Sequence, residues 1–100
     1  MGLEYAIDEL YATGWNALDT AGCEHAPDGR LYPGVGRIKT EMAQAGFDLS
    51  IRFVDLFDCH RAEWKDSAGA PAGAVVGQSE AEAAVYALSQ CRSSLAAATA

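Results

Sequence analysis

The stretch Ala74–Leu88, AVVGQSEAEAAVYAL, predicts a strand, a turn and the start of a helix. Its β-branched run ends at a turn glycine, and an S-x-x-E capping box follows. In such a box the hydroxyl of Ser79 accepts from the backbone N–H of Glu82, and the Glu82 carboxylate reaches back to the N–H of Ser79. Beyond the cap, apolar residues recur at helical spacing, so one side of the helix faces a core. These residues are Ala81, Ala84, Val85, Leu88 and Cys91.

The composition is typical of one small domain with an ordinary core. The chain has 100 residues, half of them apolar, and a formal net charge of −7. This length fits a single domain, 1–100. The longest apolar runs are too short to cross a bilayer and the N-terminus lacks a basic region, so we expect a soluble, cytoplasmic protein. Three widely spaced cysteines suit a reducing compartment rather than a disulfide framework.

We expect three parts along the chain: an N-terminal helix and loop (1–31), an α-β-β-β-α core (32–92) and a frayed, alanine-rich tail (93–100). The first helix either ends at Gly14 or continues through it to Leu18, and the sequence leaves both readings open. Residues 19–31 are predicted to form a loop, because turn residues occur there without any sustained period.

A second helix is expected to open at Tyr32-Pro33 and to close at Gly46. Proline is tolerated in the first turn of a helix, and glycine is common just past the last turn. The apolar side of this helix would face the core, and its polar side would face water. The residues on that polar side are Arg37, Lys39, Glu41 and Gln44.

Three strands are predicted to follow with short links. Phe47–Phe53 alternates apolar and polar residues, as a half-buried strand does. A second strand over Cys59–Lys65 would point His60, Ala62 and Trp64 to one face, and a short third strand lies in 74–77. An antiparallel meander with helices packed on it is the simplest arrangement. The predicted class is therefore α+β, with the order α-α-β-β-β-α.

In element order, residues 32–92 resemble the α-β-β-β-α core of double-stranded-RNA-binding domains. Gly77-Gln78-Ser79, followed by an alanine-rich helix, resembles the last strand-to-helix junction of that family. The resemblance implies a fold but not the binding chemistry, because the final helix of that family begins with a lysine cluster that grips phosphates. Here those positions hold Ser79, Glu80, Ala81 and Glu82.

The whole chain also resembles the α/β (ABA) sandwich domain found in phage and phage-derived proteins, a family without an established activity. The shared features are an opening helix ending in Gly14-Trp15, the loop 28–30, a middle helix, strands bearing Trp64 and a closing Ser-x-x-Glu-Ala helix. This resemblance implies a fold and no activity.

Four side chains have the chemistry of zinc ligands: Cys23, His25, Cys59 and His60. Neighbours on a strand point to opposite faces, so Cys59 and His60 do not easily share a tetrahedral ion. Asp58 and His60 would share one strand face, but no motif supplies a nucleophile beside them. We therefore expect no metal, no cofactor and no catalysis.

The acidic balance works against nonspecific binding to nucleic acid or to anionic membranes. By elimination, the sequence favours a non-enzymatic module that binds protein, including its own copy. Double-stranded-RNA binding is the alternative, and a metal-dependent enzyme comes third. No small-molecule partner is inferred.

The expected interaction surface is the polar face of the Phe47–Phe53 strand, formed by Asp48, Ser50 and Arg52. If this strand lies at a sheet edge, its backbone is free to pair with another chain. A symmetric partner would bring its Asp48 near Arg52 of the first copy. The sequence therefore predicts a weak homodimer.

Overall fold

The computed structural model describes residues 2–99, within which three helices, a three-stranded antiparallel sheet and a two-stranded hairpin form. The predicted α+β class and the three-stranded antiparallel sheet are confirmed, whereas the hairpin is an addition to the predicted order. In chain order the elements are α1 (Leu3–Ala12), β1 (Cys23–His25), β2 (Leu31–Pro33), α2 (Val35–Gln44), β3 (Asp48–Val54), the 3-10 turn η1 (Asp55–Phe57), β4 (Cys59–Lys65), β5 (Pro71–Gly77) and α3 (Glu80–Thr99).

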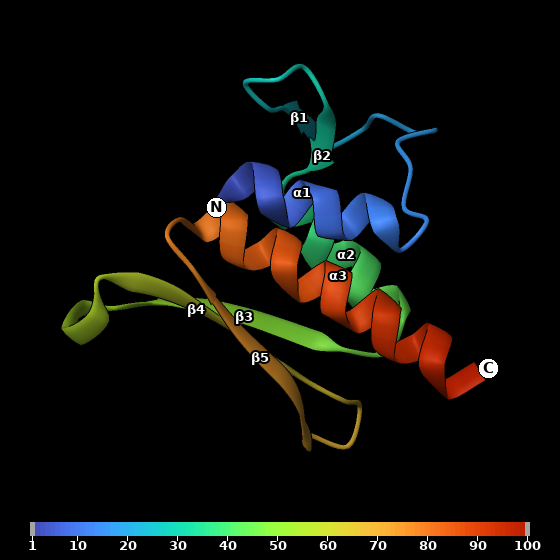
Figure 1. Ribbon diagram of the computed structural model, residues 1–100. Coiled ribbons are helices and arrows are strands. Elements are labelled where there is room, and N and C mark those ends of the chain that lie inside the picture. Colours follow the sequence, from blue (N-terminus) through green and yellow to red (C-terminus); the bar gives the residue numbers. More distant parts are fainter. Residues whose placement is uncertain (1, 100) are drawn as a thin grey trace.

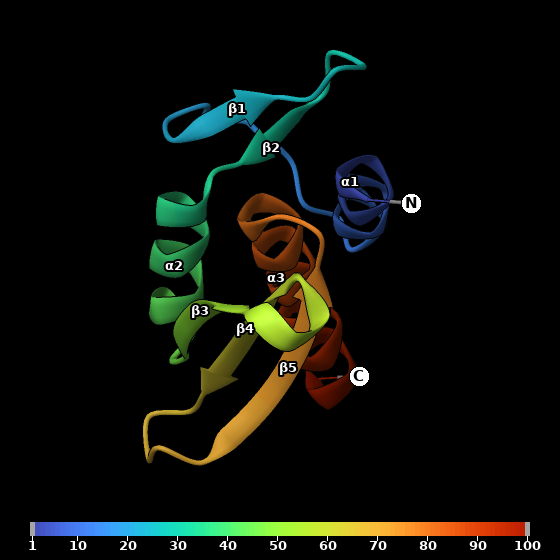
Figure 2. The same cartoon turned by 90° about the vertical axis from the view of Figure 1, so that its left-hand side faces the viewer.

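Helix α3 is the centre of the molecule, since it contacts all three strands of the sheet as well as α1 and α2. The helices lie on one face of the sheet, and the hairpin β1–β2 lies on the far side of the helix layer (Figures 1 and 2). No element within residues 2–99 covers the opposite face of the sheet (Figure 1).

The core joins the three helices to the covered face of the sheet. On α3 the buried side includes Ala83, Ala84 and Ala87, whose small side chains let neighbouring elements approach closely. Both tryptophans are buried, Trp15 at 5% exposure and Trp64 at 4%. The largest fully buried side chains are Ile7, Leu10, Ile38, Met42, Val85 and Pro33.

The start of α3 is capped by Ser79, as predicted. The N–H of Glu82 donates to Ser79 Oγ at 3.1 Å. The Glu82 carboxylate accepts from the N–H of Gln78 at 3.2 Å, one residue earlier than expected. The last strand and the last helix are therefore joined by two side-chain bonds to backbone donors, which fixes the angle between them.

Helix α1 ends at Ala12, which decides between the two readings of the sequence. The N–H of Gly14 donates to the carbonyl of Tyr11 at 3.0 Å, and Gly14 has φ +90°. This left-handed conformation is the usual one for a glycine that ends a helix. The chain then turns back, so that Trp15 enters the core.

The loop predicted for residues 19–31 is wrong at Cys23–His25 and at Leu31, because β1 and β2 pair as a hairpin, whereas the turn chemistry at Asp28-Gly29 is found as predicted. Cys23 lies opposite Pro33 and His25 opposite Leu31. The turn between β1 and β2 is formed by Asp28 and Gly29, two residue types typical of turns. Asp28 Oδ1 accepts from the N–H of Arg30 at 3.0 Å, and Gly29 has φ +90°. Three-residue strands are too short to show a hydrophobic period, which is why no strand signal is visible here.

Two element boundaries also differ from the prediction. Tyr32 and Pro33 belong to β2, and α2 begins at Val35 with Gly34 as its N-cap. At the C-terminus, α3 continues to Thr99, and Ala100 lies outside the described residues. The fraying expected over 93–100 stays a prediction. Alanine has the highest helix propensity, which favours this extension of α3.

The sheet has the order β3-β4-β5. Alternate residues of each strand face the helices, and Leu49, Ala62 and Trp64 are buried there. β4 has the predicted bounds, whereas β3 begins and ends one residue later than expected and β5 is longer. None of the helices within residues 2–99 has the length and hydrophobicity needed to span a bilayer.

Candidate functional site

The uncovered face of the sheet is the first candidate site. Its side chains are those that alternate away from the helices on β3, β4 and β5. Three of them are basic and two are acidic, so this face has a net charge of +1 in a chain of net charge −7. The charged residues are Asp48, Arg52, Arg61, Glu63 and Lys65. The face therefore differs in charge from the rest of the molecule.

The predicted residues Asp48, Ser50 and Arg52 lie together on this face, along β3. All three are exposed. Because the sheet order is β3-β4-β5, β3 is an edge strand and pairs on one side only within residues 2–99. The condition for the expected interaction surface, that its strand lies at a sheet edge, is therefore met.

In the middle of the uncovered face, the carboxylate of Glu63 lies between the guanidinium groups of Arg52 and Arg61. Glu63 Oε1 accepts from Arg61 Nε at 2.8 Å and lies 3.6 Å from Arg52 Nη2. The hydrogen bond from Arg61 and the charges of both arginines lower the pKa of Glu63 below its ordinary value. Arg52 lies directly opposite Arg61, so Glu63 offsets a like-charge pair.

Asp48 has no such partner. Among residues 2–99, its carboxylate makes no ion pair, although Lys65 lies opposite it in the register of β3 and β4. Arg52 is also available, since its side chain is 68% exposed. The two ends of the predicted surface thus present one acidic and one basic group to the surroundings.

The turn between β3 and β4 forms an exposed apolar tip. It extends beyond the helices (Figure 1), so its side chains have little to pack against. The turn contains no glycine or proline, and its conformation could not be predicted from residue types. The chain reverses there through η1 and Asp58, which adopts a left-handed conformation at φ +48°. The exposed side chains of the tip are Phe53 (48%), Leu56 (83%), Phe57 (71%) and Val76 (53%) of the adjacent β5.

A hollow of about 530 Å³ connects the tip with the charged face. Its walls combine aliphatic and aromatic groups with the two guanidinium groups of the face. The lining residues are Arg52, Val54, Phe57, Cys59, Arg61, Glu63 and Val76. The surface can therefore accept a partner that is apolar at one point and acidic beside it.

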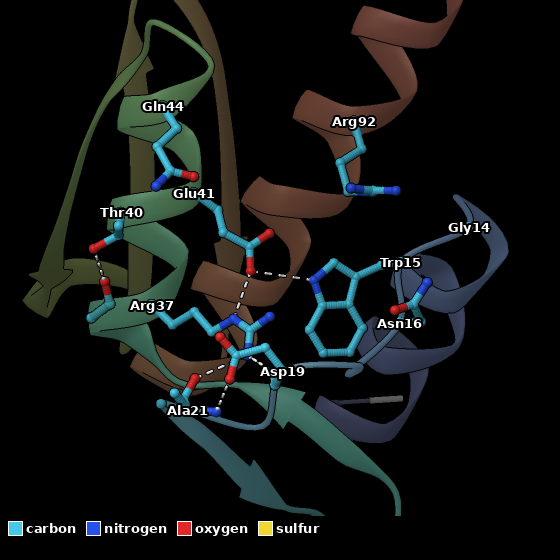
Figure 3. A pocket seen from close by; sticks show the side chains of 12 residues that line it. Gly14, Trp15, Asn16, Asp19, Ala21, Arg37, Thr40, Glu41, Gln44 and Arg92 are labelled. Atoms are coloured by element: carbon cyan, nitrogen blue, oxygen red, sulfur yellow. Dashed lines mark hydrogen bonds and ion pairs between the residues drawn. The ribbon is translucent and has the colours of Figure 1, made fainter.

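A second, more polar hollow of about 650 Å³ lies between α2, α3 and the segment that follows α1 (Figure 3). Arg37 Nε donates to Glu41 Oε2 at 2.8 Å, and Trp15 Nε1 points to the same oxygen at 3.4 Å. The Arg37 guanidinium stands 5.5 Å from the centre of the Trp15 ring, within the range of a cation–π contact. The expectation that Arg37 and Glu41 face water is wrong, because the segment 13–22 folds over them.

Arg37 holds that segment and the adjoining β1 through its Nη1 group. It donates to the carbonyl of Asp19, to the carbonyl of Ala21 at 2.9 Å and to Cys23 Sγ at 3.2 Å. Across the hollow, Arg92 Nε donates to Thr13 Oγ1 at 2.8 Å. Arg37 of α2 and Arg92 of α3 therefore bond the segment that follows α1 to these two helices.

The zinc candidates do not meet. Cys23 and His25 lie on β1 in the hairpin, whereas Cys59 and His60 lie on β4 in the sheet, on opposite sides of the helix layer (Figure 1). Among residues 2–99, no group of three or more His, Cys, Asp or Glu side chains is placed to hold a metal ion. The ring of His60 packs edge-on against Phe53, 5.2 Å between centres.

The suggested pairing of Asp58 with His60 on one strand face is wrong. Asp58 belongs to the turn, in a left-handed conformation that precedes β4. The third cysteine, Cys91, is 3% exposed in the core, and burial raises the pKa of its thiol. These groups therefore do not form a nucleophile with an adjacent base.

Comparison with known proteins finds no matching family model, no matching curated protein and no matching solved structure. The resemblances to RNA-binding and phage sandwich domains stay predictions.

Proposed function

We propose that the protein is a non-enzymatic interaction module that binds protein through its sheet, with a second copy of the chain as the first partner. The observation that carries this proposal is β3, an edge strand beside an uncovered sheet face. An edge strand presents backbone donors and acceptors to a further strand. A contiguous exposed apolar cluster, such as the tip at Leu56 and Phe57, is typical of a contact surface.

The polar hollow supports a binding role less well than the sheet does. Arg37, Glu41 and Arg92 are bound to groups of the same chain, so a ligand would have to displace those bonds. The sheet face requires less rearrangement, since Asp48 makes no ion pair among residues 2–99 and Arg52 is 68% exposed with only a 3.6 Å contact to Glu63. A cytoplasmic location is part of this proposal, because the three cysteines are free thiols.

Double-stranded-RNA binding is the second candidate. It is favoured by the element order α2-β3-β4-β5-α3, which is that of the RNA-binding family. Against it, the first turn of α3 carries Glu80 and Glu82, which repel phosphates where that family places lysines. The chemistry of the helix start thus ranks RNA below protein as the partner.

Analytical ultracentrifugation over a hundredfold range of protein concentration tests the proposal. The average mass should rise from that of one chain toward that of two as the concentration increases. A constant mass of one chain over the whole range would contradict self-association.

A further inference from the structure

The side chains of β3 and the residue before it form a self-complementary series about Ser50. The segment Phe47–Phe53 reads F-D-L-S-I-R-F, so that each residue matches its counterpart at equal distance from the centre. The matches are Phe47 with Phe53, Asp48 with Arg52, and Leu49 with Ile51. In each match an aromatic meets an aromatic, an acid meets a base, or an aliphatic meets an aliphatic.

We propose that two copies of the chain pair antiparallel along β3, with Ser50 of one copy opposite Ser50 of the other. The two sheets then join into one continuous six-stranded sheet, with both helix layers on the same face. This inference rests on the proposed function and specifies its partner, its strand and its register.

The charges select this register among its neighbours. When Ser50 faces Ser50, both Asp48–Arg52 pairs form on the uncovered face, one on each side of the two-fold axis. A shift by two residues in either direction breaks both Asp48–Arg52 pairs. Asp48 then faces Val54 or Ser50, and Arg52 faces Ser50 or Gly46. A shift by four places Asp48 opposite Asp48 or Arg52 opposite Arg52, which is repulsive. Shifts by an odd number would put the helix layers on opposite faces.

The incomplete pairing of these charges within one chain supports the proposed register. Among residues 2–99 the Asp48 carboxylate has no ion-pair partner. Arg52 shares Glu63 with Arg61, and its own contact with Glu63 is the longer one, 3.6 Å against 2.8 Å. A second carboxylate beside Arg52 would balance the surplus positive charge of this group.

The aromatic ends of the segment support the same register on the other face. Phe53 points to the side of the helices but is 48% exposed, since it lies beyond them. In the proposed pairing it faces Phe47 of the second copy. A hollow of about 460 Å³ lies at the Phe47 end of the sheet, lined by Ala43, Gly46 and Phe47 and by the polar residues Asp48, Lys65, Asp66 and Ser67. The pairing therefore offers each exposed Phe53 ring an apolar neighbour.

Charge reversal tests the register. Asp48→Arg places arginine opposite Arg52 in both pairs, and Arg52→Asp places aspartate opposite Asp48, so each variant alone should dimerise about tenfold more weakly than the natural chain. A mixture of the two variants, and the double variant D48R/R52D, should dimerise about as tightly as the natural chain. Glu9→Arg, an exposed charge reversal of the same size on α1, should leave dimerisation unchanged.

Cross-linking gives an independent reading. In a chain with Cys23→Ser, Cys59→Ser and Cys91→Ala, adding Ser50→Cys should produce a disulfide-linked dimer under mild oxidation, because directly opposite residues lie within disulfide range. Adding Val54→Cys to the same chain, which keeps Asp48 and Arg52, should not, since the two copies of position 54 would lie about 26 Å apart along the strand. Circular dichroism melts confirm that each variant is folded.

The outcomes separate the two proposals. If the natural chain stays monomeric, both the self-association and the register are wrong. If it dimerises but the variant mixture fails to restore binding and the Ser50→Cys chain fails to cross-link, the register alone is wrong and the dimer uses another surface. Restoration of binding together with a cross-link through position 50 supports both.

Discussion

Ser79 supplies an acceptor to a backbone donor at the start of α3 that has no partner within the helix. Its Oγ accepts from the N–H of Glu82 at 3.1 Å. Ser79→Ala should lower the free energy of unfolding by about 1 kcal/mol, since that donor loses its acceptor. Urea unfolding followed by circular dichroism measures the difference. Ser93→Ala, an exposed serine in the interior of the same helix, is the matched control and should not destabilise the protein. Equal midpoints for Ser79→Ala and the natural chain would contradict a capping role.

At the scale of the elements, the pairing of β4 with β5 requires a glycine, which has no side chain, at position 73. Gly73 lies opposite Trp64 in the register of these strands. A Cβ on Gly73 would stand 2.2 Å from Trp64 Cζ2, well inside van der Waals contact, and the Trp64 ring is buried with little room to move. Gly73→Ala should therefore destabilise the protein by about 1–3 kcal/mol through overpacking.

Gly36→Ala is the matched control for this prediction. Gly36 lies inside α2, where a Cβ would meet no atom within 4 Å. Alanine there should raise the free energy of unfolding by about 0.5–1 kcal/mol, because glycine is the poorer helix former. Thermal melts of the two variants should shift in opposite directions. A Gly73→Ala variant that melts at or above the temperature of the natural chain would mean that the ring of Trp64 does not pack closely against Gly73.

At the scale of the whole molecule, the charge distribution opposes binding to a polyanion. The chain has a net charge of −7, and its uncovered sheet face reaches only +1. We expect no appreciable affinity for a generic RNA duplex at physiological salt, because too few phosphates would be neutralised. Fluorescence polarisation with a labelled double-stranded RNA measures this. Micromolar binding that weakens steeply with added salt would place RNA ahead of protein as the partner.

Much of the fold follows from local patterns in the sequence. The cap at Ser79, the strand Cys59–Lys65 and the alternating faces of Asp48, Ser50 and Arg52 are all found where the residue spacing predicts them. These features depend on periodicity and on side-chain bonds to nearby backbone, which act within a few residues. The edge position of β3 follows from chain order, since consecutive strands with short links pair with their neighbours.

The remaining features depend on contacts between residues far apart in the chain. The hairpin β1–β2 has strands too short to leave a pattern, and its Cys23 is held by Arg37, which also binds Asp19 and Ala21. The helical pattern places Arg37 on the exposed side of α2, but because of these same contacts its side chain is half-buried. The apolar tip at Leu56 and Phe57 is likewise exposed only because the helices end short of it (Figure 1). Local patterning sets which side of an element is apolar, but the position of the neighbouring elements sets which of those sides is covered.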